Sequence, residues 1–72
     1  MAEKLITIAS FSNAIEAHIL RTRLEAEDIP CLIANEHVLG AMPHMVNLFG
    51  GVQVKVRASD EARALEIMQE EN

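Results

Sequence analysis

The amino-acid sequence predicts an α+β fold, a ferredoxin-like two-layer sandwich with the element order β-α-β-β-α. Three observations lead to this fold class. Apolar and polar residues alternate without a fault in VQVKVR, residues 52–57, as in a strand with one buried face. Residues 14–27 and 60–72 instead space their apolar side chains at the helical period. Two short apolar runs, 4–10 and 31–35, supply the remaining strands.

The chain is expected to form a single domain over residues 1–72. A chain of 72 residues buries only about 60% of the surface that its unfolded form exposes. Half of its residues are hydrophobic, but only Phe11 and Phe49 are aromatic. The core must therefore be small and built from aliphatic side chains.

The first strand, KLITIAS at residues 4–10, precedes a helix that begins after Asn13. Asn13 is a good N-cap, and Glu16 three residues later can return a hydrogen bond as in a capping box. One face of this helix is apolar and is expected to pack on the sheet: Ala17, Leu20 and Leu24.

A second apolar line on the same helix contains Ile15, Ile19 and Ala26. At 100° per residue it lies well away from the first line, so one sheet cannot cover both. Two interpretations stay open. The line either touches the C-terminal helix or the 36–49 segment, or it forms a contact between copies of the chain, with Ile15 and Ile19 in a homodimer.

The second half of the chain supplies two strands and a helix. Pro30 fixes the exit from the first helix, and CLIAN follows as the second strand. In the third strand the valines face inward and residues 53, 55 and 57 face water. Ser59 is expected to cap the last helix. Its predicted buried face contains Ala64, Leu65, Ile67 and Met68.

The topology follows from the handedness of chain crossovers. A right-handed β-α-β unit makes the first two strands parallel, and the third strand fits antiparallel between them. We therefore expect a three-stranded mixed sheet of strand order 1-3-2, with both helices on one face.

The stretch NAIEAHILRTRLEAEDIPCLIANEH, together with VQVKVRASDEARALEIM, resembles the DUF2007 family of small prokaryotic proteins. The likeness lies in the helix start, the helix exit at LEAEDIP and the loop start at NEH. Ala14 replaces the usual proline, and Asp28 stands where glycine is common. Asp tolerates the left-handed conformation of such a C-cap better than most residues.

This resemblance implies a ferredoxin-like fold akin to the PII nitrogen regulators and a role in signal transduction. It implies no catalytic residues, so the chain is not expected to be an enzyme. In PII-like proteins the connection between the second and third strands is the effector loop. Residues 36–51 occupy that connection here.

The charge balance argues against nucleic acid as a partner. Six basic and eleven acidic residues give a formal net charge of −5, which opposes binding to phosphate backbones. No signal peptide and no apolar run long enough for a membrane span is apparent, so a soluble, cytoplasmic protein is expected.

The sequence gives little support to two possible chemical sites. Glu36, His37 and His44 are possible metal ligands, with Cys31 as a fourth, but their spacing fits no zinc pattern. The lone Cys31 could act as a nucleophile beside a histidine, but it begins an apolar strand and is more typical of a small buried hydrophobe. No cofactor is expected.

The 36–49 segment is the remaining candidate site. Asn35 could cap a single helical turn over residues 36–39, ended by Gly40. The segment is long for a connection in a compact domain and too hydrophobic for a disordered linker. We predict a regulatory module that binds another protein, or itself, through Val38, Leu39, Met42 and Met45. The alternative is a small-ligand or metal sensor using Glu36, His37 and His44.

Overall fold

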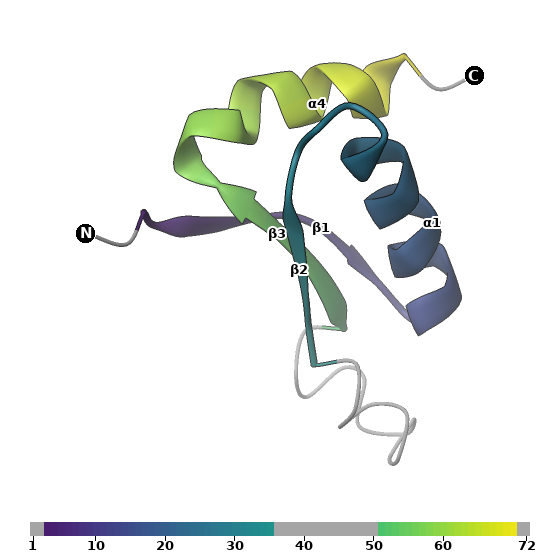
Figure 1. The fold of residues 1–72 in the computed structure, drawn as a ribbon. Coiled ribbons are helices and arrows are strands. Elements are labelled where there is room, and N and C mark those ends of the chain that lie inside the picture. The colour runs from purple at the N-terminus through teal and green to yellow at the C-terminus, as the bar shows by residue number, and fades with distance from the viewer. Residues whose placement is uncertain (1–2, 36–50, 71–72) are drawn as a thin grey trace.

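A computed structural model describes residues 3–35 and 51–70 of the chain (Figure 1). The predicted order of elements is confirmed. It runs β1 (Leu5–Phe11), α1 (Ala14–Glu25), β2 (Cys31–Ala34), β3 (Val52–Arg57), the single-turn 3₁₀ helix η2 (Ala58–Asp60) and α4 (Glu61–Gln69). Within these described ranges, neither helix has the length and apolarity that a membrane crossing requires.

The three strands form one sheet in the predicted order β1-β3-β2. Val56 of β3 lies opposite Ile6 on one side and Cys31 on the other, and both neighbouring strands are antiparallel to β3. The prediction of a mixed sheet was therefore wrong. β1 and β2 do run parallel, but β3 separates them, so no parallel pair shares hydrogen bonds.

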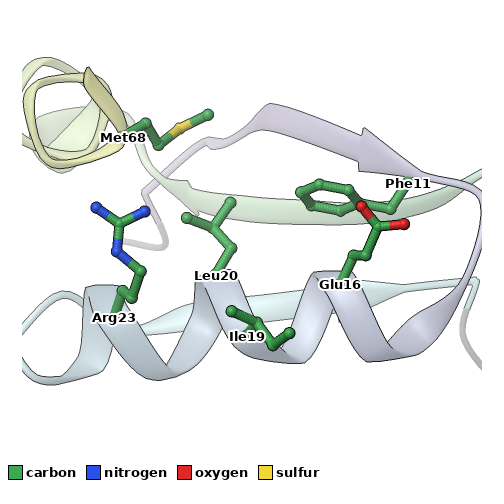
Figure 2. Close-up of a pocket in the computed structure, with 6 residues that line it drawn as sticks. All are labelled: Phe11, Glu16, Ile19, Leu20, Arg23 and Met68. Carbon is green, nitrogen blue, oxygen red and sulfur yellow. The ribbon is translucent and has the colours of Figure 1, made fainter. Parts of the chain in front are cut away.

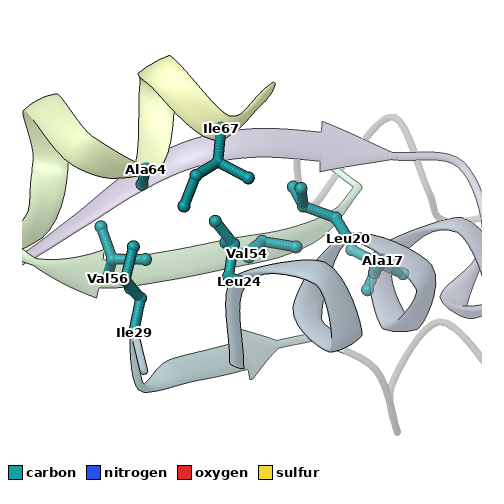
Figure 3. Packing of buried hydrophobic residues seen from close by; sticks show 9 residues of the cluster. Ala17, Leu20, Leu24, Ile29, Val54, Val56, Ala64 and Ile67 are labelled. Carbon is teal, nitrogen blue, oxygen red and sulfur yellow. The ribbon is translucent and has the colours of Figure 1, made fainter. Parts of the chain in front are cut away.

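Both helices cover the same face of the sheet, and the core lies between the two layers (Figure 3). The valines of β3 are buried against α1 and α4, while residues 53, 55 and 57 are only partly buried or exposed. The buried residues are Ala17, Leu20, Leu24, Ile29, Val52, Val54, Val56, Ala64 and Ile67. The predicted core face of α1 is thus confirmed in full.

The start of α1 confirms the predicted cap. The Oδ1 atom of Asn13 accepts a hydrogen bond from the backbone N–H of Glu16 at 3.0 Å. Glu16 returns the bond through its carboxylate, which accepts from the side-chain amide of Asn13, also at 3.0 Å. The return bond thus goes to the side chain of Asn13, whereas a capping box uses the backbone.

The end of α1 is closed by Asp28 in the left-handed conformation, with φ of 65°. The N–H of Ile29 donates to the carbonyl of Leu24, and the N–H of Asp28 donates to that of Glu25, each at 3.0 Å. These two bonds define a Schellman motif. Leu24 and Ile29 are both buried, so the hydrophobic contact that accompanies this motif is also available.

The start of α4 differs from the prediction. Asp60, and not Ser59, is the N-cap residue, and its side chain makes no capping bond. Arg57 donates to the Asp60 carboxylate at 2.8 Å, and the backbone N–H of Ser59 donates to the Glu3 carboxylate at 2.7 Å. Leu65 is also not buried as predicted, since 39% of it is exposed.

Candidate functional site

The second apolar line of α1 is open to solvent. Ile15 is 72% exposed and Ile19 is 58% exposed, the two highest values among the large apolar side chains of the described residues. Thr22 and Ala26, on the same side of the helix, are exposed as well. The sheet lies on the opposite side of α1, against Leu20 and Leu24, which explains why it leaves this line uncovered.

A half-open pocket of about 360 Å³ lies beside this line, where α1 meets the end of β1 and α4 (Figure 2). Its walls are mainly apolar. Figure 2 shows Glu16 pointing from α1 towards Phe11 of β1, and Arg23 pointing towards Met68 of α4. The lining residues are Phe11, Glu16, Ile19, Leu20, Arg23 and Met68.

The two charged side chains of this pocket are held by hydrogen bonds. Arg23 donates from its guanidinium to the carbonyl oxygen of Ile67 at 2.6 Å. Ile67 lies in the last turn of α4, where the helix dipole favours a cation, and its carbonyl also accepts from the backbone N–H of Glu70 at 3.2 Å. Glu16 is tied to Asn13 at the other end of α1. A carboxylate and a guanidinium group are therefore held in place on the same side of one helix.

The sequence alone did not reveal this pocket. Phe11, Arg23 and Met68 come from three elements, and only the folded chain brings them together. Among the described residues that line it, Ile19 alone was predicted as a site residue. One signal was present, because Glu16 and Arg23 are seven residues apart and therefore share a face of the helix.

The connection between β2 and β3 is held at both ends by described residues. Asn35 adopts the left-handed conformation with φ of 71°, and its side-chain amide donates to the carbonyl of Gly51 at 3.2 Å. Gly51 has φ of 88°, and a Cβ atom there would lie 2.8 Å from the carbonyl oxygen of Phe11. Only glycine fits this position without strain.

The predicted site residues within this connection lie outside the described part of the chain, as does the predicted turn over residues 36–39. They are Glu36, His37, Val38, Leu39, Met42, His44 and Met45. The structure brings Asn35 and Gly51 together on either side of them. Among residues 3–35 and 51–70, no group of three or more His, Cys, Asp or Glu side chains is placed to hold a metal ion.

Cys31 is partly buried at the start of β2. Its Sγ atom donates to the carbonyl of Ile29 at 3.4 Å. Burial raises the pKa of the thiol, and the nearby carboxylate of Glu25 raises it further. A raised pKa lowers the fraction of the reactive thiolate, so this environment favours an inert thiol over a nucleophile.

Comparison with known proteins gives one family match. Residues 5–72 match the family DUF2007, described as "Putative prokaryotic signal transducing protein". No curated protein matches the chain. No solved structure matches it either.

Proposed function

Because the chain belongs to the DUF2007 family, whose description is signal transduction, we propose that it is a regulatory protein-interaction module without catalytic activity. It acts through the connection between β2 and β3, over residues 36–49. Four apolar side chains of this connection provide the binding energy by burial against a partner protein. They are Val38, Leu39, Met42 and Met45.

The observation that carries this proposal is the hydrogen bond between Asn35 and Gly51. It joins the two ends of the connection, so that this stretch leaves and returns to the sheet at one place. When the two ends of a loop are held close together, the loop has less conformational freedom to lose on binding. A rigid β-sheet frame that holds a long apolar connection is a common arrangement for recognition.

Paired substitutions within the connection test this function. Affinity capture from the native organism, quantified by mass spectrometry, compares the unmodified chain with Leu39→Ser/Met42→Ser and with His37→Ala/His44→Ala. We expect the first variant to lose the specifically enriched protein and to keep its melting temperature. The histidine variant should retain the partner, because its apolar side chains are unchanged.

The rival sensor function predicts the reverse. If Glu36, His37 and His44 formed a metal or small-ligand site, divalent cations or nucleotides would raise the melting temperature of the unmodified chain by mass action. The histidine substitutions would abolish that rise. Loss of binding in the histidine variant together with unfolding of the Leu39→Ser/Met42→Ser variant would overturn the protein-interaction proposal.

A further inference from the structure

From the surface of α1 we infer that a second copy of this chain docks there, with the two α1 helices antiparallel across a two-fold axis near Ile19. The docking surface, which we name the outer face of α1, consists of Ile15, Ile19, Thr22 and Ala26, flanked by Glu16 and Arg23. None of these residues belongs to the connection between β2 and β3, so the inference does not depend on the proposed function.

Apolar exposure is the first reason for a partner at the outer face of α1. Ile15 and Ile19 are mostly exposed, and they are one helical turn apart. Their line is centred roughly 150° around the helix from the buried line of Ala17, Leu20 and Leu24 at 100° per residue. No rearrangement of α1 against its own sheet could bury both lines, so a body other than this sheet would have to cover the outer face of α1.

The charge pattern identifies that body as a second copy. Glu16 and Arg23 lie on the same flank of α1, separated by about 10.5 Å along the axis, and Figure 2 shows Leu20 between them. In an antiparallel pair related by a two-fold axis, the same flank of each helix meets its copy. A residue that lies a given distance before the axis in one helix then faces the residue that lies the same distance after the axis in the other. Glu16 of one copy then faces Arg23 of the other, twice.

The apolar line has the same symmetry. Its ends, Ile15 and Ala26, have their midpoint within one residue, or about 1.5 Å, of the midpoint between Glu16 and Arg23. In the register that sets Ile15 against Ala26 and Ile19 near Thr22 of the second copy, Glu16 and the facing Arg23 are offset by two residues, or about 3 Å along the axis, a gap that these long side chains can span. An unrelated protein would have to supply this complementary order of charges, whereas a second copy already carries it.

The size of the surface sets the expected strength. A stable interface usually buries about 800 Å² on each partner. The contact centres on one helix of 12 residues per copy. We therefore expect a weak dimer that forms in the micromolar range or above, and its detection requires a concentration series.

Sedimentation velocity over a concentration series tests the apolar part. The unmodified chain should shift from monomer to dimer, and Ile19→Glu should raise the dissociation constant by about tenfold or more. Leu65→Glu is the matched control, since it places the same charge at an exposed leucine of α4 and should leave the dissociation constant unchanged. An unmodified chain that stays monomeric up to about 1 mM, a concentration at which even very weak contacts associate, overturns the inference.

Charge reversal tests the antiparallel register. Glu16→Lys alone places Lys against Arg23, and Arg23→Glu alone places Glu against Glu16, so each variant should associate more weakly than the unmodified chain. In an equimolar mixture every facing pair is again opposite in charge, and a mixed dimer should form. Two weakened variants that fail to combine would overturn the antiparallel register and with it the inference.

Cross-linking gives a readout that leaves Glu16 and Arg23 unchanged, should either substitution disturb the helix. In a Cys31→Ser background, Ile19→Cys should form a disulfide with its own copy under mild oxidation, because facing residues near a two-fold axis come within disulfide reach. Leu65→Cys in the same background is the control. Equal cross-linking of the two variants would contradict docking at the outer face of α1.

Discussion

Asp28 shows how one residue can be both a departure from a family pattern and a fit to the structure. The resemblance to DUF2007 indicated glycine at this position, and Asp is one of the few other residues that tolerate a left-handed backbone. The observed φ of 65° and the two bonds of the Schellman motif confirm that the chain turns here as the glycine would. The family pattern indicates that a left-handed residue is needed here, because that need is local, but the structure was required to show that Asp28 meets it.

The backbone strain at this position gives a prediction. Asp28→Gly should raise the free energy of unfolding by about 0.5–1 kcal/mol, because it removes a Cβ atom from a left-handed residue. For a domain of this size the melting temperature should rise by roughly 2–8 °C. Asp28→Ala, the control, should lower it. A thermal melt followed by circular dichroism checks both, and a less stable Asp28→Gly variant would show that the aspartate side chain outweighs the strain.

At the scale of elements, helices and strands were predictable where the deciding forces are local. The alternation of VQVKVR and the Asn13 cap are both decided by neighbouring residues in the sequence, and both are confirmed. The start of α4 was not predictable, because Glu3, from the other end of the chain, binds the N–H of Ser59. The pocket beside α1 is likewise the product of three elements meeting. Its Arg23 contact reaches Ile67, which is far away in sequence.

The packing of α1 on the sheet is tested by Leu24→Ala. Leu24 is fully buried and belongs to the core shared with β3 and α4. Its removal should cost about 2–5 kcal/mol, which is a large part of the stability of a small domain. Chemical denaturation should show a lower midpoint with an unchanged slope. Ile15→Ala on the exposed side of the same helix is the control, and an equal loss in both variants would mean that α1 is packed differently.

At the scale of the whole molecule, the two proposed surfaces come from different segments of the chain. One is the connection whose ends meet at Asn35 and Gly51, and the other is the outer face of α1. The first rests on sequence content and on the Asn35–Gly51 hydrogen bond, and the second rests on exposure and charge in the structure. Sequence periodicity left the Ile15 and Ile19 line open between an internal contact and an oligomer contact, because periodicity reports a face and not what covers it.

If dimerisation uses the outer face of α1 alone, the melting temperature should depend on protein concentration in a specific way. A dimer that forms only from folded chains stabilises the fold by mass action, so the melting temperature of the unmodified protein should rise with its concentration. At about ten times the dissociation constant the gain is about 1.4 kcal/mol, or roughly 5–10 °C for a domain of this size. Ile19→Glu should melt at the same temperature at every concentration.

The Leu39→Ser/Met42→Ser variant completes this test, because its substitutions lie in the connection and leave the outer face of α1 unchanged. Its melting temperature should therefore keep the full concentration dependence of the unmodified protein. Differential scanning calorimetry over a hundredfold concentration range measures all three proteins. If the connection variant loses the dependence and Ile19→Glu keeps it, the copies associate through the connection, and the division of the molecule into two separate surfaces is wrong.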